Sequence, residues 1–401
     1  MAHLSGLNVL KTSKETFISY FFNVGGLIAG FLVASQLGLF QKAPWTLALY
    51  PTVIGAKGVL EGILSGRLST ALHLGTAHPQ FLGNTKSFYK LVEAVIVLTF
   101  ITSLTMGIIS LLFGHFLWGI TLADLAAVPS IAVATMTLGL VLIIATLKVA
   151  FFSFKKGADP DVIVYPVMSA VATVFITCCY IATLNLFFAH PTAGKIATAL
   201  IGTGHLAFVL FIIYRNLHAA EFTKTIREAL ATLIIVAFIV NVTGTLLKGI
   251  GNYARTNREI FTLYPAIIGL VSNVGSVVGS TATTKLALGI LKPKLSAIKN
   301  HIPTILGAWL PSLAISVLLA TITALLHGIS SLTAFYNLNM ILLLANVMAM
   351  LMIILLSYSI SVVTFQKGLN PANFVIPIET SFAASITSTA LLAAIMLVGT
   401  I

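Results

Sequence analysis

Apolar residues along the chain gather into long runs that are separated by short polar stretches. Eleven of these runs reach about 20 residues, the length at which an α-helix crosses the hydrocarbon core of a bilayer. The pattern therefore predicts an all-α polytopic membrane protein with eleven transmembrane helices. Their expected positions are about Phe17–Phe40, Ala48–Gly75, Phe88–Trp118, Leu125–Phe154, Val162–Ala189, Ile196–Tyr214, Ala229–Leu247, Pro265–Gly289, Ile302–Leu326, Leu338–Val363 and Phe374–Ile401.

The second and eighth runs are copies of one sequence. A shift of 214 residues places Pro51 on Pro265 and Gly75 on Gly289. Small residues recur at every fourth position in both copies, which gives each helix a smooth face that another backbone can approach closely. We expect this face to serve helix packing. Its members are Gly58, Gly62 and Gly66 in the first copy and Ser272, Ser276 and Ser280 in the second.

A second repeated element opens the fifth and eleventh runs. The sequence K-G-A-D-P at 156–160 returns as K-G-L-N-P at 367–371, and the same shift of 211 residues places Pro166 on Pro377. We expect both prolines to shape the packing of these helices. Because the two shifts differ by only three residues, they predict a nearly ungapped duplication of five spans.

The sixth run has no counterpart, and the geometry of a membrane explains why. Five spans reverse the direction of the chain, and one further span restores it, so the two repeats are parallel and related by a pseudo-twofold axis along the membrane normal. The predicted organisation is therefore a first five-helix repeat at 1–190, a linking helix and connector at 191–222, and a second repeat at 223–401.

Composition agrees with a membrane protein. Hydrophobic residues make up 58% of the 401 residues and charged residues 8%, whereas a soluble domain carries about 25% charged residues. The two cysteines, Cys178 and Cys179, are adjacent inside a predicted span, which argues against a disulfide scaffold or a zinc site. No H-E-x-x-H sequence, nucleophile elbow or pair of catalytic carboxylates is present, so the protein is not expected to be an enzyme.

The formal net charge of +12 follows from topology and does not indicate a nucleic-acid partner. No basic stripe lies beside an aromatic platform. If the N-terminus is cytoplasmic, about 16 basic residues fall inside and 5 outside, with Lys57 left within a span. We therefore expect a multi-pass protein of the plasma (cytoplasmic) membrane, surrounded by lipid, with its N-terminus inside and its C-terminus outside.

The repeated helices resemble a known family. The segment S-N-V-G-S-V-V-G-S-T-A-T-T-K-L-A-L-G at 272–289 resembles the second-span signature of the MgtE magnesium-channel family. The segment A-K-G-V-L-E-G-I-L-S-G-R-L-S-T-A-L-H-L-G at 56–75 is similar to the first-repeat signature of solute carrier family 41, the two-repeat eukaryotic relatives. The D-P-x3-V-x-P entry to the fifth span, 159–166, fits the same group.

This resemblance implies a channel or transporter for Mg²⁺, which would be the transported ion, with no organic cofactor. It also implies an ion path between the repeats, lined by the second and fifth spans of each. Because one chain supplies both halves, a monomer could suffice as an internal pseudo-dimer, and a higher oligomer stays open.

The chain departs from the family at the expected acidic ion site. Family members carry an aspartate seven residues after the proline of the fifth span, where this chain has Thr173 and Ala384. Glu379, two residues after Pro377, is the candidate replacement. Glu61 is the second candidate metal ligand, although Lys57 lies one helical turn before it and an internal ion pair is the simpler interpretation.

Magnesium is often held through one or two carboxylates and several waters, so hydroxyls, amides and carbonyls can complete its path. Each proline frees the carbonyl four residues earlier, at Val162 or Asn373. Polar side chains in these spans could line the path or bond between helices, and both interpretations stay open for Asn273, Ser169, Thr173, Thr380 and Ser381.

Two alternatives to a magnesium channel or transporter remain. One is a sodium-coupled magnesium exchanger, and the other is a non-transporting membrane scaffold that kept the fold after losing the aspartates. Outside the membrane, we expect His73 to be an interfacial side chain, and Asp159 and Asp161 to lie in a solvated cytoplasmic turn.

Overall fold

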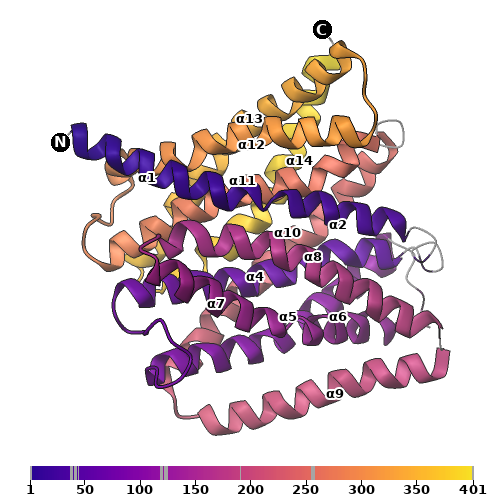
Figure 1. Cartoon of the computed structure of the whole chain (residues 1–401). Helices are drawn as coiled ribbons and strands as arrows, with labels where there is room; N and C mark the ends of the chain where they lie inside the picture. The colour runs from indigo at the N-terminus through magenta and orange to yellow at the C-terminus, as the bar shows by residue number, and fades with distance from the viewer. Residues whose placement is uncertain are drawn as a thin grey trace.

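The computed structural model describes residues 2–36, 39, 43, 45–117, 121, 125–189, 191–253 and 258–399. Over these ranges the chain forms helices and no strand, so the predicted all-α fold is confirmed. Figure 1 shows most helices running side by side along a common direction. With the labels of Figure 1, the helices are α1 (Ala2–Phe21), α2 (Val24–Ser35), α4 (Trp45–His73), α5 (Lys86–Leu117), α6 (Ala127–Leu138), α7 (Val141–Lys155), α8 (Pro160–Ala189), α9 (Pro191–Asn216), α10 (Ala220–Tyr253), α11 (Arg258–Ala287), the 3-10 helix η2 (Leu295–His301), α12 (Ile302–Leu326), α13 (Leu332–Gln366), the 3-10 helix η3 (Pro371–Asn373) and α14 (Val375–Gly399).

Nine stretches within the described ranges are long and apolar enough to cross a bilayer, which supports a multi-pass membrane protein. The pair α1–α2 supplies one of them, and the pair α6–α7 supplies another. Helices α4 and α10 are not among the nine. Helix α4 carries Lys57, Glu61 and Arg67 along its middle, and α10 opens with a charged stretch at 221–228. The count of eleven transmembrane helices therefore stays a prediction.

Corresponding helices of the two halves end in the same way. Gly75 and Gly289 have φ angles of 70° and 71°, and Gly157 and Gly368 have φ angles of 74° and 68°. Beyond each glycine an amide turns back to a carbonyl of the last helical turn, as in the 2.9 Å bond from Thr76 N to Ala71 O. A left-handed residue at this position favours glycine. The repeated glycines thus close α4, α11, α7 and α13 with one type of turn.

Helices α4 and α11 lie at the centre of the molecule, where each contacts the other and both contact α8 and α14. The two central helices meet at Thr70 and Thr284, whose hydroxyl oxygens are 3.2 Å apart. The 214-residue shift superimposes these two threonines. Contact between corresponding residues is what an approximate twofold axis produces.

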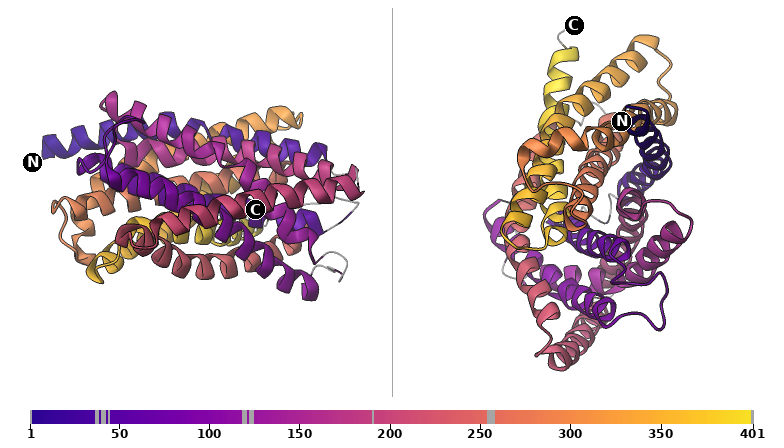
Figure 2. Two further views of the ribbon diagram at one scale, coloured as in Figure 1. Left: turned by 90° about the horizontal axis from the view of Figure 1, so that it is seen from below. Right: turned by 90° about the vertical axis from the view of Figure 1, so that its left-hand side faces the viewer.

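The first helix of each half packs across the molecule against the third helix of the other half. Helices α1 and α12 are in contact, and the Thr16 hydroxyl donates to the Gly307 carbonyl at 2.8 Å. In the same way, α10 packs against α5, where Ser110 lies 3.4 Å from the Asn241 amide oxygen. Figure 2 (right) shows the indigo α1–α2 beside the orange helices of the second half. Each half is therefore completed by a helix of the other.

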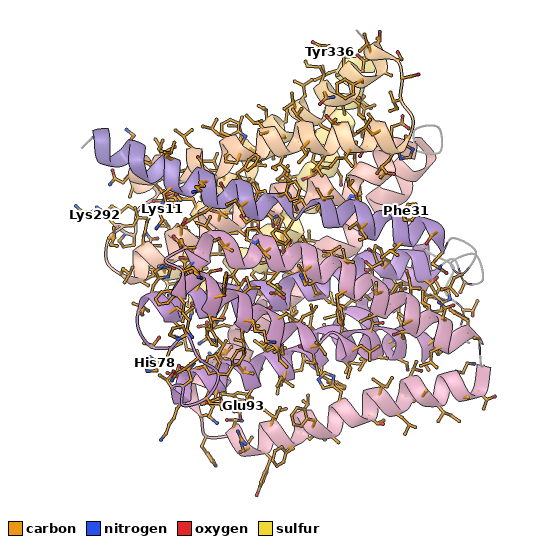
Figure 3. The ribbon with its side chains drawn as sticks, viewed as in Figure 1. Lys11, Phe31, His78, Glu93, Lys292 and Tyr336 are labelled. Atoms are coloured by element: carbon orange, nitrogen blue, oxygen red, sulfur yellow. The ribbon has the colours of Figure 1, made fainter. Side chains whose placement is uncertain are left out.

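Helix α9, which joins the two halves, lies at the edge of the bundle and packs against α5, α6 and α8 (Figure 1). Its outer face is apolar, with Leu200 66% exposed and Phe211 57% exposed. An apolar face of this kind suits contact with lipid. In Figure 3 the labelled Lys11, His78 and Lys292 lie toward one end of the bundle, and Phe31 and Tyr336 toward the other.

Candidate ion site between the two halves

Glu379 projects from α14 onto α11 of the same half, and Tyr165 of α8, in the other half, is its neighbour. Its side chain is 0% exposed, so no water-sized space adjoins it. Among the described residues no well-formed hydrogen bond reaches either carboxylate oxygen, and the Ser272 hydroxyl is a donor close enough to interact. Tyr165 of α8 and Ser272 of α11 are its polar neighbours. An ionised carboxylate in such a place is costly unless a cation or a proton accompanies it.

Gly275 of α11 makes the room for this carboxylate. A β-carbon at Gly275 would lie 2.4 Å from Glu379 Oε1 and 2.5 Å from Cδ. The glutamate therefore lies flat on the helix backbone, and any larger residue at position 275 would displace it.

Glu61 of α4 is also buried, at 5% exposed, but its surroundings satisfy it. The hydroxyl of Thr146 on α7 donates to Glu61 Oε1 at 2.6 Å. The Lys57 ammonium lies one turn away and points to the carbonyls of Met168 and Ser169 on α8, at 3.4 and 3.5 Å. Lys57 and Glu61 are not within the 4.0 Å of a direct ion pair, so the expected pair acts across a longer distance.

The two buried glutamates occupy corresponding contacts in the two halves. The 214-residue shift takes Glu61 to Gly275, and the 211-residue shift takes Met168 to Glu379. In the first half the carboxylate thus comes from α4, and in the second it comes from α14. The donor Thr146 corresponds to Ser357, whose hydroxyl is buried and unbonded among the described residues. Lys57 corresponds to Val271, so the second half lacks both the cation and the donor.

Asn273 of α11 joins three helices beside Glu379. Its amide nitrogen donates to Asn23 Oδ1 at 3.1 Å, and its amide oxygen accepts from Ser169 of α8 at 3.3 Å. Tyr20 of α1 contacts the Asn273 carbonyl at 3.5 Å. Asn23 stands at the break between α1 and α2, where its side chain bonds the Tyr20 carbonyl at 2.9 Å. Asn273 and Ser169 are thus brought together, and Tyr20, Tyr165, Asn23 and Gly275 are members of the site that the sequence did not single out.

The sequence profile of the MgtE family, described as a divalent cation transporter, matches residues 50–183 and again residues 264–395. These two segments cover about two thirds of the chain and include most of α4, α8, α11 and α14. The chain belongs to the MgtE family. Both segments begin one residue before the prolines that the 214-residue shift superimposes, so the family unit is present twice.

Curated relatives point to the same family. The chain is similar to solute carrier family 41 member 3 of Rattus norvegicus, with 23% identity over 415 residues that cover 96% of this chain and 87% of the rat protein. The Mus musculus protein of that name is 24% identical over 262 residues, which cover 62% of this chain and 51% of the mouse protein. Among solved structures, the chain was matched to an outward-facing multidrug resistance MATE family transporter of the MOP superfamily. The alignment covers 98% of this chain and 96% of the transporter chain, with 12% identity. Its TM-score of 0.40 is too low to indicate a shared fold.

At the positions where MgtE proteins are expected to carry aspartate, the structure has no carboxylate. Thr173 donates to the Ser169 carbonyl of its own helix at 2.6 Å, and the Ala384 carbonyl accepts from Ser388 at 2.5 Å. Thr380 and Ser381 likewise donate to the Pro377 carbonyl, at 3.1 and 2.8 Å. These three hydroxyls therefore bond within their own helices.

The glycine face of α4 lies on the entry to α14. A β-carbon at Gly62 would lie 2.6 Å from Ile376 and 3.3 Å from Pro377, and one at Gly66 would lie 3.5 Å from Ala372. Ser280 on the matching face of α11 donates to Asp161 of α8 at 2.5 Å. Since Gly66 corresponds to Ser280 and Ala372 to Asp161, the two faces make corresponding contacts. Both Ser272 and Ser276 are buried on this face of α11.

Each carbonyl freed by a proline is bonded by a hydroxyl from the first helix of its own half. Ser19 lies 3.4 Å from the Val162 carbonyl, and Thr232 lies 3.1 Å from the Asn373 carbonyl. These carbonyls are therefore engaged by protein rather than left free to bind a hydrated ion.

The two hydroxyls belong to a third repeated element, K-T-x-[KR]-E-x3-[ST], at 11–19 and 224–232. A shift of 213 residues would have revealed it. Glu15 of the first copy lies beside the backbone of Asp159, and Glu228 of the second accepts from Asn373 Nδ2 at 2.6 Å. The element thus fastens the first helix of each half to the loop that opens the fifth.

A surface cavity of about 510 Å³ lies away from this interface, where the start of α10 meets the loop at Gly368 and Leu369. Its charged lining residues are Lys224, Arg227 and Glu228.

A second group of ligating side chains lies where α4 ends and α8 begins. His73 Nε2 is 3.6 Å from Asp159 Oδ1, and His73 Nδ1 is 3.9 Å from Asp161 Oδ2. Burial, together with the neighbouring Asp161 carboxylate, raises the pKa of Asp159. The expectation that both aspartates lie in a solvated turn is wrong for Asp161, which is 3% exposed because α11 covers it.

Proposed function

We propose that this protein moves divalent cations, magnesium first among them, along the interface between its two halves, with Glu379 as the acidic ligand. Membership of the MgtE family supports the substrate class. The choice of Glu379 rests on one observation: it is a wholly buried carboxylate beside α11 that no described cation pairs with and that no well-formed hydrogen bond from the described residues satisfies.

Glu61 is the weaker candidate for the transported ion. Thr146 already donates to it, and Lys57 supplies a positive charge one turn away. A divalent cation would have to compete with that internal cation. Glu379 has no internal cation beside it among the described residues, so a divalent cation would have only a proton to displace.

The arrangement described is closed around Glu379, since the carboxylate is 0% exposed. Since α11 and α14 belong to the same half, passage of a hydrated ion between the halves requires α8 of the first half, whose Tyr165 neighbours Glu379, to separate from α11. Asn273 and Ser169 lie at this boundary and would offer polar atoms to the ion's water shell when it opens. One chain contributes both halves, so we propose that a monomer suffices.

Magnesium entry into proteoliposomes, followed with an internal magnesium dye, tests this function. The wild-type protein should admit Mg²⁺ without sodium, and Glu379→Gln should slow entry by about tenfold or more, because it removes the charge while keeping the shape. Glu61→Gln is the matched control, with a buried glutamate from the corresponding contact, and should retain most of the flux.

Two other outcomes decide against parts of the proposal. Entry that begins only when an opposing sodium gradient is applied would indicate a sodium-coupled exchanger. Equal magnesium flux in wild type and Glu379→Gln would show that Glu379 is not part of the path. Folded wild-type protein that admits no magnesium with or without the sodium gradient would favour the non-transporting scaffold.

A further inference from the structure

We infer that His73, Asp159 and Asp161 form a binding site for a divalent transition metal at the end of the α4–α8 contact. The site is distinct from the proposed path at Glu379 and does not depend on it. One ligand atom from each residue can be chosen so that all three lie within 4.8 Å of one another. They come from three places in the chain: the last turn of α4, the α7–α8 loop and the first turn of α8.

The hydrogen bonding of His73 prepares its ring to bind a metal. Nδ1 lies 2.9 Å from the Ser69 carbonyl, which can only accept, so Nδ1 carries the proton. In the neutral ring Nε2 then presents its lone pair to Asp159 Oδ1, 3.6 Å away. Asp159 Oδ1 also accepts from the Asp161 backbone amide at 2.9 Å, and a cation between Oδ1 and Nε2 would bind the lone pair that each atom has left. A backbone carbonyl bonded to the second ring nitrogen is the usual support of a metal-ligating histidine.

Asp161 supplies a second, independent sign of a missing cation. Its side chain is 1% exposed, and its Oδ1 accepts from Ser280 at 2.5 Å. Oδ2 lies 3.9 Å from His73 Nδ1, beyond hydrogen-bond distance, and none of the described residues donates a hydrogen bond to it. A buried carboxylate with one oxygen aimed into the group and left without a donor is expected where that oxygen binds a ligand.

The cations of neighbouring helices do not fill this place. Lys285 of α11 is near both aspartates, but its ammonium donates to Thr304 at 2.7 Å and lies 3.4 Å from His301 Nδ1. It is not within 4.0 Å of either carboxylate. Glu15 of α1 lies beside the backbone of Asp159, and its charge is offset by Lys11, which is 3.9 Å away and also bonds the Gly157 carbonyl. None of the described lysines therefore contacts the two aspartates directly, and a divalent ion would balance their charge.

The ligand set selects the metal. One imidazole and two carboxylates suit Mn²⁺, Fe²⁺, Co²⁺ or Zn²⁺, whereas Mg²⁺ prefers oxygen ligands and retains most of its water. We therefore expect the site to hold a transition metal in the presence of millimolar Mg²⁺. His73 lies one turn beyond Thr70, so a metal there would sit beside the contact of α4 and α11.

Cobalt binding by the purified, tag-free, full-length protein tests this inference. The expected result is one Co²⁺ per chain with visible d–d absorption, and X-ray absorption that shows a single imidazole ligand. His73→Gln and Asp161→Asn should each weaken binding by about tenfold or more and His73→Gln should remove the imidazole signal. His78→Gln, at an exposed histidine in the following loop, should change neither quantity.

Thermal unfolding in detergent without metal shows whether each variant is folded. The inference would be overturned if folded His73→Gln protein bound Co²⁺ as tightly as wild type does. It would also be overturned if the wild-type protein bound no stoichiometric Co²⁺, and the group would then be only a histidine–aspartate ion pair. Displacement of Co²⁺ by an equal concentration of Mg²⁺ would overturn the selectivity. Magnesium flux is measured separately, so loss of this site and failure of the proposed transport function are distinguishable.

Discussion

At the residue scale, the two halves stabilise one buried carboxylate each by different means. Glu61 has a hydroxyl donor from α7 and a lysine one turn away, whereas Glu379 has a glycine beneath it, the Ser272 hydroxyl as a neighbour and no well-formed hydrogen bond from the described residues. A buried charge without partners costs several kcal/mol, in rough terms. The first carboxylate is therefore suited to a permanent structural role, and the second to binding something that comes and goes.

The contact between Gly275 and Glu379 can be tested by a double-mutant cycle. In Gly275→Ala the new methyl group would lie 2.4 Å from Oε1, so we expect thermal stability to fall by about 1–3 kcal/mol and magnesium flux to fall with it. In a Glu379→Ala background the same change should cost little, because the carboxylate it strikes is gone.

Gly204→Ala provides the control for this cycle, since a β-carbon there meets no atom within 4 Å. Equal destabilisation by Gly275→Ala in both backgrounds would contradict the contact. The measurement is thermal unfolding of purified protein in detergent, read alongside proteoliposome flux.

A site residue can be predicted from the sequence when its side chain is unusual inside an apolar span. Glu379, Asn273 and Ser169 stand out there as polar groups, and the structure brings them into one neighbourhood. The role of Gly275 could not be foreseen, because a glycine in a small-residue helix face looks like all its neighbours. The site of His73 and Asp161 was also hidden, because its members are far apart in the chain and only the packing of α4, α8 and α11 buries them.

At the element scale, the proline of each fifth span is accommodated by the first span of the same half. Ser19 and Thr232 take up the carbonyls that Pro166 and Pro377 free. A freed carbonyl in a membrane span must find a donor or water. The freeing of these carbonyls follows from the chemistry of proline alone, whereas the donors lie over a hundred residues away in sequence and depend on tertiary packing.

Because α4 approaches α14 closely at one point, two glycines on the same face of α4 should differ in how much stability is lost on substitution by alanine. A β-carbon at Gly62 would lie 2.6 Å from Ile376, whereas one at Gly58 would first meet Thr380 at 3.9 Å. Gly62→Ala should therefore lower stability by about 1–3 kcal/mol. Gly58→Ala should be neutral or stabilising by up to about 1 kcal/mol, since alanine favours helix.

The two variants differ by one helical turn and are compared by thermal unfolding in the same detergent. In an Ile376→Ala background, Gly62→Ala should cost less, because Ile376 Cγ2, the atom 2.6 Å from the new β-carbon, is gone. Equal effects of Gly58→Ala and Gly62→Ala would show that α4 does not approach α14 as described.

At the scale of the whole molecule, the halves are interlocked as well as packed side by side. Helices α1 and α10 each lie against the opposite half, while the third repeated element ties each of them to its own fifth helix. Hydropathy could predict the helices, and the repeats could predict their correspondence. The exchange of first helices could not be read from either, because an apolar helix face does not specify its partner.

Movement of one half against the other should pass through the contact of Thr70 and Thr284, whose hydroxyl oxygens are 3.2 Å apart. In a background in which Cys178 and Cys179 are replaced by serine and alanine, Thr70→Cys with Thr284→Cys should form a disulfide within one chain under mild oxidation. If transport requires α4 and α11 to part there, oxidation should abolish magnesium flux and a reductant should restore it.

The single-cysteine variants control for oxidation itself and should keep their flux. Full flux through quantitatively crosslinked protein would mean that this contact stays closed throughout transport, and would place the moving part where α8 meets α11 near Glu379.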